Sequence, residues 1–266
     1  MAEDTDAPEP EEIFERTRRE GARRLDRPLL ELISTSIAAG FDILVGVVVL
    51  TLLESQLEHQ FGTQAAHVFG SIGFGVGFVF LIVGRGELFT ENFLVPLAGL
   101  HGRGRGALGK IVELWTVSPI FNIAAGGFLA VLVSIHSVLP YGTGNAARKT
   151  AETIYANGWL ALFVSAVFAG SLITAMTWFV EGQSSVGVRI AVGWTAGAIL
   201  ALGSFDHVIV VTLELILGIR FGAHIHWSFV IENFFLAAAG NMVGGIGLVT
   251  LNRFTQAKSG GRAASA

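Results

Sequence analysis

Two short stretches of this chain place charged side chains inside otherwise apolar segments. The first stretch, residues 84–92, contains Arg85, Glu87 and Glu91. A charge at the centre of a membrane helix costs about 2.5–3.5 kcal/mol on insertion scales, so these side chains must face protein, water or each other. Non-helical backbone at such depth is tolerated only where it is buried in protein or lines a cavity. The stretch predicts either a break that lines a binding site or an ordinary loop between two short helices.

The second stretch, residues 203–207, ends in Asp206 and His207. A histidine can donate a hydrogen bond to an anion, and its charge changes near neutral pH. Ionisable residues within a membrane span usually serve a function. The alternative is a packing histidine that is bonded to a backbone carbonyl. Both interpretations require an element that holds the histidine inside the membrane.

Composition identifies those elements as membrane helices. The chain has 266 residues, of which 52% are hydrophobic and only 14% charged, with 34 glycines and a mean hydropathy of +0.63. Soluble domains carry about 25% charged residues. Residues 1–28 alone hold nine acidic residues and six arginines, so the rest of the chain is low in charge. We therefore predict a polytopic all-α membrane protein in the lipid bilayer of the cell (inner) membrane.

Six segments are long enough to span a bilayer, which needs about 20 mostly apolar residues. The two charged stretches interrupt the second and the fifth segment. The segments cover residues 32–53, 66–100, 111–135, 159–180, 188–219 and 224–251. We expect three regions: a charged arm at 1–28 that is partly disordered, a transmembrane domain at 29–254 and a flexible tail at 255–266.

The distribution of lysine and arginine predicts the orientation, because cytoplasmic loops carry an excess of both. Counting the loops of this topology puts 13 basic residues on the side of the termini and three on the opposite side. Both termini are therefore expected in the cytoplasm, which requires an even number of spans.

The two halves of the chain share features in the same order. Ala39-Gly40 and Ala169-Gly170 lie in the first and fourth segments, and Asn-x-x-x-Gly begins at Asn122 in the third and at Asn241 in the sixth. Three spans in each half give the halves opposite orientations, so the pattern predicts an inverted 3+3 repeat. Paired broken helices in such a repeat indicate a binding site near the middle of the membrane.

The sequence lacks the residues and motifs that are typical of several classes of enzyme. Cysteine is absent, which excludes thiol nucleophiles and thiolate metal sites. Neither Gly-x-Ser-x-Gly nor His-Glu-x-x-His occurs. We expect no enzyme, no metal ion, no cofactor and no nucleic-acid partner; an intramembrane enzyme and a non-transporting scaffold remain the competing classes.

Three motifs together resemble those of the formate/nitrite transporter family. They are Glu-Leu-Phe-Thr at 87–90, Phe-Asp-His at 205–207 and Gly-Asn-x-x-Gly-Gly at 240–245, and the likeness covers about residues 29–254. The resemblance implies an aquaporin-like protomer of six helices with two re-entrant breaks. It also implies a homopentamer with one pore in each protomer, which passes small monovalent anions or their conjugate acids.

The resemblance also implies which residues form the pore. The family's central histidine corresponds to His207 and its loop threonine to Thr90. Its two apolar constrictions correspond to Phe78 and Leu200, and its asparagine in the sixth segment corresponds to Asn241.

Two residues depart from the family pattern. Arg85 stands where a small residue is usual, and Asp42 lies in the middle of the first segment. An unpaired arginine within a break is costly, so we expect Arg85 to pair with Asp42, Glu87 or Glu91, with Asp42 favoured. Such a pair would fasten the break to the first segment. In the alternative interpretation, Arg85 attracts the anion into the vestibule.

Overall fold

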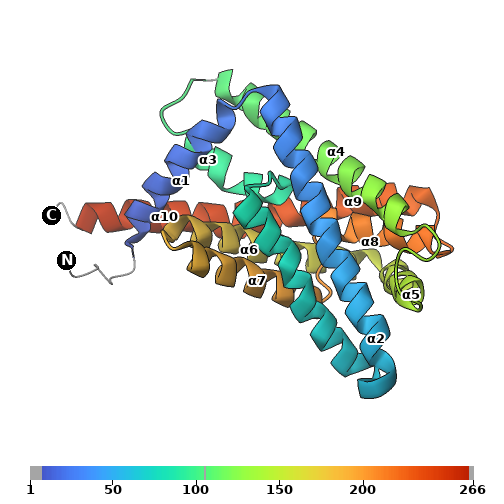
Figure 1. Cartoon of the computed structure of the whole chain (residues 1–266). Helices are drawn as coiled ribbons and strands as arrows, with labels where there is room; N and C mark the ends of the chain where they lie inside the picture. The colour runs from blue at the N-terminus through green and yellow to red at the C-terminus, as the bar shows by residue number, and fades with distance from the viewer. Residues whose placement is uncertain (1–7, 105, 264–266) are drawn as a thin grey trace.

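The computed structural model describes residues 8–104 and 106–263, and every regular element in these ranges is a helix (Figure 1). In chain order they are α1 (Pro10–Leu25), α2 (Leu29–Gly84), the 3₁₀ helix η1 (Phe89–Phe93), α3 (Val95–Gly99), α4 (Gly106–Val133), α5 (Thr143–Ala156), α6 (Trp159–Gly182), α7 (Val186–Leu202), α8 (Val208–Arg220), α9 (Trp227–Met242), the π helix η2 (Val243–Thr250) and α10 (Leu251–Ala263).

Six spans arise from these helices, as the sequence predicts. Four described helical stretches are long and apolar enough to cross a membrane: α2, α4, α6 and the continuous stretch Trp227–Ser259. Helix α2 supplies two of the spans, because Gly62 has non-helical dihedral angles (φ 79°, ψ 164°) and the chain turns back there. The shorter α7 and α8 together form the fifth span. The all-α fold with six spans is therefore confirmed.

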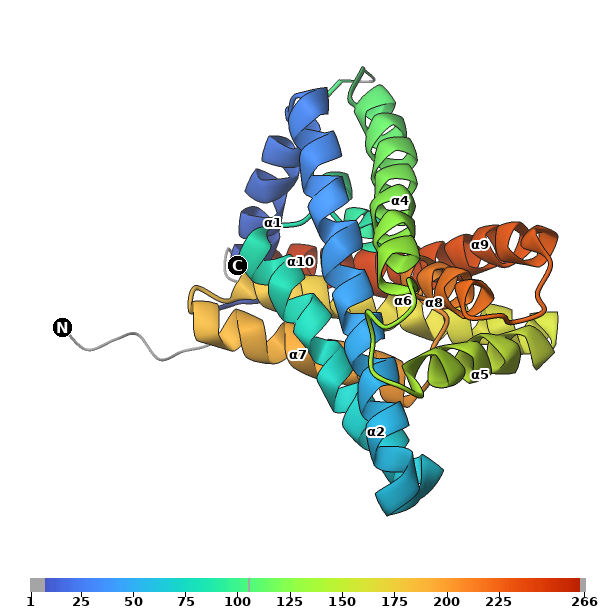
Figure 2. The same cartoon turned by 45° about the vertical axis from the view of Figure 1, so that its right-hand side comes forward.

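The second and fifth spans are broken where the charged stretches lie. Helix α2 ends at Gly84, and the chain then runs without regular structure to η1 and the short α3. Helix α7 ends at Leu202, and α8 begins six residues later at Val208. Figure 2 shows the second half of α2, which precedes the first break, crossing α7, which precedes the second break. Residues of the two breaks meet although they are far apart in sequence.

The two halves of the bundle pack through matching glycines. A Cβ atom added to Gly40 would lie 2.2 Å from the carbonyl oxygen of Asn122, and one added to Gly170 would lie 2.2 Å from that of Asn241. No side chain fits at either crossing. The first helix of each half therefore contacts the third helix of that half at backbone distance, which is consistent with the inverted repeat.

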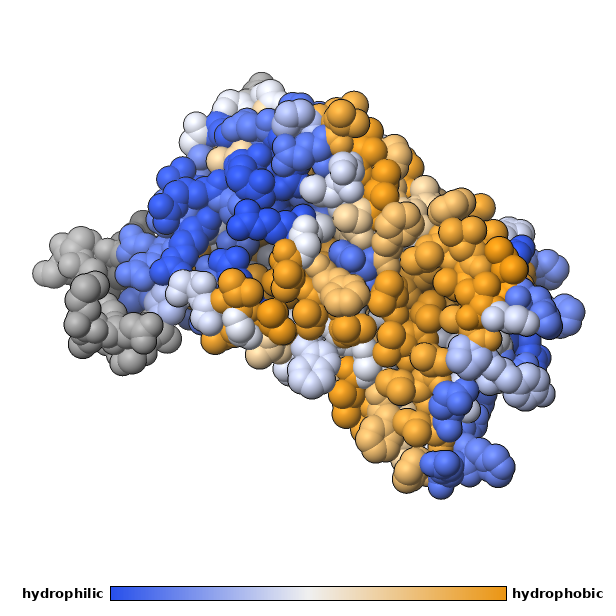
Figure 3. Space-filling view, viewed as in Figure 1, coloured by the Kyte–Doolittle hydropathy of each residue, from blue (hydrophilic) through white to orange (hydrophobic). Residues whose placement is uncertain are grey.

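The surface is divided as a membrane protein requires. Figure 3 shows an apolar band across the middle of the molecule, with hydrophilic residues gathered at its two ends. The larger hydrophilic area lies over α1, the helix that contains most of the charged residues of the arm. Exposed phenylalanine and leucine side chains such as Phe235 and Leu160 are therefore placed to contact lipid or another protomer.

The N-terminal region differs from the expectation of partial disorder. Residues 10–25 form α1, whose Gly21 crosses α3 so closely that an added Cβ would lie 2.1 Å from the carbonyl oxygen of Val95. The ring of Phe14 also contacts that of Phe254 in α10, with 5.0 Å between centroids. Residues 1–7 lie outside the described part of the chain.

The C-terminal region is likewise ordered further than the sequence suggests. Helix α10 continues to Ala263, whereas we expect a flexible tail from residue 255. The glycines there favour flexibility, but α10 extends a span that is already formed. The contact between α1 and α10 places both described ends of the chain on one side of the bundle, as an even number of spans demands. Residues 264–266 are not described.

Candidate pore and its two cavities

The two breaks meet at a buried pair of polar side chains. The Nε2 atom of His207 lies 2.6 Å from the Oγ1 atom of Thr90, and neither residue is exposed to solvent. His207 caps α8, and its Nδ1 atom accepts a hydrogen bond from the backbone N–H of Val210 at 3.4 Å. Since Nδ1 accepts, the neutral ring carries its proton on Nε2 and donates it to Thr90. The threonine hydroxyl then keeps its own proton free for another acceptor.

The two residues that are expected to form the constrictions, Phe78 and Leu200, are both buried. The ring of Phe78 stands edge-on to that of His207 with 6.4 Å between centroids. Leu200, at 1% exposure, belongs to the other half of the chain. The close fit around Phe78 depends on Gly197, because an added Cβ there would lie 2.9 Å from the phenyl ring. The His207 ring thus lies beside a buried phenyl ring.

Asn122 holds the first break in place. Its Nδ2 atom donates to the carbonyl oxygens of Ser36 and Glu87 at 2.8 and 3.0 Å, and its Oδ1 atom accepts from the backbone N–H of Phe89 at 3.1 Å. Glu87 and Phe89 belong to the break, whereas Ser36 lies in the first part of α2. The buried amide therefore supplies hydrogen bonds to backbone groups of the break and ties the break to the first span.

Asn241 does the same for the second break. It donates to the carbonyl oxygens of Ala166 and Asp206 at 2.8 and 2.9 Å, and it accepts from the backbone N–H of Val208 at 2.9 Å. The arrangement repeats that of Asn122 in the other half. Asn241 thus fixes the backbone on both sides of His207, whereas Asn122 is a site residue that the sequence shows only through the repeated Asn-x-x-x-Gly motif.

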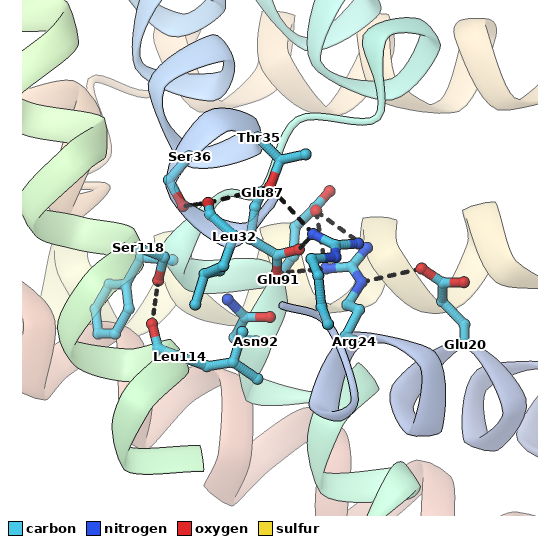
Figure 4. Close-up of polar contacts among 12 residues, drawn as sticks. Glu20, Arg24, Leu32, Thr35, Ser36, Glu87, Glu91, Asn92, Leu114 and Ser118 are labelled. Atoms are coloured by element: carbon cyan, nitrogen blue, oxygen red, sulfur yellow. Dashed lines mark hydrogen bonds and ion pairs between the residues drawn. The ribbon is translucent and has the colours of Figure 1, made fainter. Parts of the chain in front are cut away.

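Arg24 of α1 and Arg27, two residues beyond the end of that helix, bind the acidic residues of the first break (Figure 4). Arg24 lies 3.1 Å from Glu87 and 3.4 Å from Glu91, and Arg27 also pairs with Glu87. Both glutamates are buried, so the arm neutralises charges that the apolar interior disfavours. Arg24 is in turn held by Glu20 of its own helix at 3.2 Å.

The expected partner of these acids was Arg85, and that prediction is wrong. Arg85 is exposed, has a left-handed backbone (φ 54°), and forms no ion pair with any residue the structure describes. Asp42 is half-buried and likewise has no ion pair within the described ranges. Arg24 and Arg27 occupy the place expected of Arg85. A sequence signal existed, since Glu20 stands three and four residues before Arg23 and Arg24, a spacing that favours a charged helix.

Two cavities approach the centre from opposite ends. The arm-side cavity, about 240 Å³, is lined by Arg24, Leu81 and Glu87 among others. The far-side cavity, about 210 Å³, is lined by residues that include Leu200 and Asp206. Glu87 and Asp206 each lie close in sequence to one member of the Thr90–His207 pair, so each break contributes to the lining of one cavity.

Known proteins match this chain over nearly its whole length. The profile of the formate/nitrite transporter family matches residues 11–255. The inner membrane protein YfdC of Escherichia coli (strain K12) is 28% identical over 93% of this chain and 78% of its own length. The formate channel BtFdhC of Bacillus thuringiensis is 24% identical over 90% of this chain and 92% of its own.

Solved structures show the same fold. A pentameric formate channel with formate bound superimposes with a TM-score of 0.73 at 18% identity, covering 85% of this chain and 96% of that one. A second channel of the family gives a TM-score of 0.77 at 16% identity, covering 91% and 98%.

Proposed function

Because this chain belongs to the formate/nitrite transporter family, we propose that it passes a small monovalent anion, or the conjugate acid, through a pore in each protomer. The observation that carries the proposal is the buried His207–Thr90 pair, which joins the two broken helices. Like the related pentameric channel, the chain is proposed to assemble as a homopentamer.

The proposed mechanism follows from the cost of desolvation. A bare anion loses its hydration between Phe78 and Leu200, which is expensive in hydrocarbon. The Thr90 hydroxyl offers the anion a hydrogen bond there, and the Nε2–H group of His207 polarises that hydroxyl by donating to it. The passing species is stabilised at the centre without any covalent step, and an anion that has taken up a proton crosses the apolar residues more easily.

Flux measurements in proteoliposomes test the proposal. We expect formate or a similar small anion to equilibrate in wild-type vesicles and to do so at least about tenfold more slowly with Thr90→Val, since a lost hydrogen bond to a charged group is worth about 1.5–3 kcal/mol. His207→Ala should lower the flux as well. Ser259→Ala, on the exposed part of α10, is the matched control. Unchanged flux in His207→Ala would remove the histidine from the mechanism, and a complete lack of wild-type flux would favour a non-transporting scaffold.

The proposed orientation places the arm side in the cytoplasm. It rests on the excess of basic residues on the side of the termini and on the contact of α1 with α10. A reporter that is active only in the periplasm should stay inactive when fused after Ala266. Activity of that reporter would reverse the assignment.

A further inference from the structure

Asp42 lies near the middle of the first span with its carboxyl group unpartnered. Leu29 and Gly62 bound the first half of α2, and Asp42 is about 5 Å from the midpoint of that helix. Its side chain is half-buried and makes no hydrogen bond or ion pair with any residue in the described ranges. It lines neither of the two cavities. Because a carboxyl group at this depth must face protein or water, Asp42 needs a partner that its own protomer does not supply.

The surface around Asp42 is open to a neighbouring molecule. One turn away on either side, Ala38 and Val45 are also half-buried. In the second half of α2, Phe80 is 47% exposed, and a Cβ atom added to the exposed Gly84 would lie 3.7 Å from the Oδ2 atom of Asp42. These five residues form one face of the first two spans, which we call the Asp42 face.

Helix α7 brings a free hydroxyl group to the same depth. It packs along the second half of α2 (Figure 2). A Cβ atom added to Gly77 would lie 2.7 Å from the carbonyl oxygen of Asp42, and one added to Gly197 would lie 2.9 Å from the ring of Phe78, the residue after Gly77. Thr195 lies only about 3 Å before Gly197 along α7. Asp42 and Thr195 are therefore at the same level of the bundle, on different faces of the protomer.

The exposed side of α7 is suited to close contact with another helix. Thr195 is exposed, and its hydroxyl makes no hydrogen bond with any residue that the structure describes. It continues an exposed row of small residues that begins with Gly187 and Ala191, spaced four residues apart. Small residues allow a second helix to approach closely, which favours association within lipid. A hydroxyl group can bond to a carboxyl group in either protonation state of the acid.

Other hydroxyl groups of the spans fit less well. Ser171 is half-buried and already donates to a backbone carbonyl of its own helix. Thr116 is exposed, but it lies about 9 Å before Asn122, the residue of α4 that crosses the first span at Gly40. Its exposed neighbour one turn away is the bulky Val112, as is typical of a surface that faces lipid. Thr195 thus matches Asp42 in depth, in exposure and in its free donor.

We propose that the Asp42 face packs against α7 of the adjacent protomer, whose Thr195 donates a hydrogen bond to the Asp42 carboxyl group. This inference rests on the homopentamer proposed above. Rotation about an axis normal to the membrane keeps every residue at its depth, so Asp42 meets Thr195 of the adjacent protomer at one level. Each protomer contributes one Asp42 face and one α7 to this head-to-tail contact, and a closed ring leaves neither of them uncovered.

Disulfide cross-linking tests the contact directly. The chain has no cysteine, so an introduced pair reports this contact alone. In Asp42→Cys/Thr195→Cys, a membrane-permeant oxidant should join protomers into a ladder of up to five chains on a denaturing gel without reductant. The bond requires Cβ atoms about 3.5–4.5 Å apart.

The controls isolate the predicted pair. Each single variant, and the depth-mismatched Asp42→Cys/Thr116→Cys, should run as single chains after the same oxidation. An assembled Asp42→Cys/Thr195→Cys pentamer that gives no ladder overturns the inference. So does an equal ladder from the mismatched pair, or a dimer from Asp42→Cys alone, which would place two copies of Asp42 side by side.

A second measurement does not depend on cysteines. Asp42→Ala and Thr195→Val should each lower the temperature at which the pentamer dissociates in mild detergent, followed by native electrophoresis. The double variant should lower it no further than the larger single effect, because both changes remove the same contact. Thr116→Val removes an exposed hydroxyl from α4 and should dissociate as the wild type does. Fully additive effects, or no effect of either single variant, contradict the proposed contact.

Failure of the pentamer itself gives a different result. A wild-type protein that is monomeric or trimeric in native mass spectrometry overturns the proposed assembly. A wild-type pentamer whose cysteine pair does not cross-link overturns only the contact between Asp42 and Thr195.

Discussion

At the scale of single residues, two asparagines hold the two breaks in place. Asn122 and Asn241 each accept from one backbone N–H group of a break and donate to one carbonyl of that break and one carbonyl of a neighbouring helix. A pore that interrupts two helices exposes such groups at a depth where water is scarce. The same residue type recurs in both halves because only a side chain with donors and an acceptor meets this need.

Replacing either asparagine by alanine should therefore destabilise the fold. Each unpaired buried group costs about 1–3 kcal/mol, so Asn122→Ala and Asn241→Ala should both lower the thermal unfolding temperature measured in detergent. Asn145→Ala, at an exposed position of α5, serves as the control and should change it little. If the two variants unfold at the temperature of the control, the amides do not act as described.

At the scale of elements, α1 packs onto the membrane helices as a structural part of the fold. It lies across α3, and Arg24 of α1 together with Arg27 just beyond it binds the acids of the first break. Removing one partner of a buried pair strands the other charge and costs about 3–5 kcal/mol.

Arg24→Ala should thus lower thermal stability strongly, because Glu87 and Glu91 lose a partner. Arg85→Ala is the matched comparison; it removes an exposed arginine from the same cavity and should change stability by less than about 0.5 kcal/mol. Thermal unfolding of the two variants in the same detergent decides between these roles. A larger effect of Arg85→Ala would restore the importance that the sequence suggests for it.

The attachment of α1 should also weaken in acid. Burial acts to raise the pKa of Glu20, but hydrogen bonds and the charges of Arg23 and Arg24 prevail and lower it to about 2. A lowered pKa contributes stability that is complete above the ordinary value of 4.5 and is lost as the pH falls through about 2. We expect the protection of α1 amides against hydrogen exchange, corrected for intrinsic rates, to decrease over this range. In Glu20→Gln the protection should already be lower at pH 5 and change less with pH.

At the scale of the whole molecule, the apolar surface must be covered by lipid or by other protomers. Lipid provides no hydrophobic drive for helices to associate, so assembly depends on close packing of small residues. Native mass spectrometry in mild detergent should give five times the 28.2 kDa of one chain. A stable monomer or trimer under these conditions would contradict the proposed pentamer.

The sequence by itself determined the membrane class, the six spans and the positions of both breaks. These features follow from local composition: apolar runs partition into lipid, and charged or glycine-rich stretches interrupt them wherever they occur. The repeat was also visible, since Ala39-Gly40 and Asn122 have counterparts in the second half. Each of these signals lies within one continuous segment of the chain.

Only the tertiary structure decided which charges meet. Arg85 lies two residues from Glu87 in sequence but is exposed, whereas Arg24 lies 63 residues away and pairs with it. The packing of α1 on α3 brings Arg24 there, and no local pattern encodes that crossing. The same holds for Asp206 and Glu214, which share a cavity with Lys149 only because α5 and α8 pack together. The energy of a charge depends on its surroundings in space, and the fold alone assembles those surroundings.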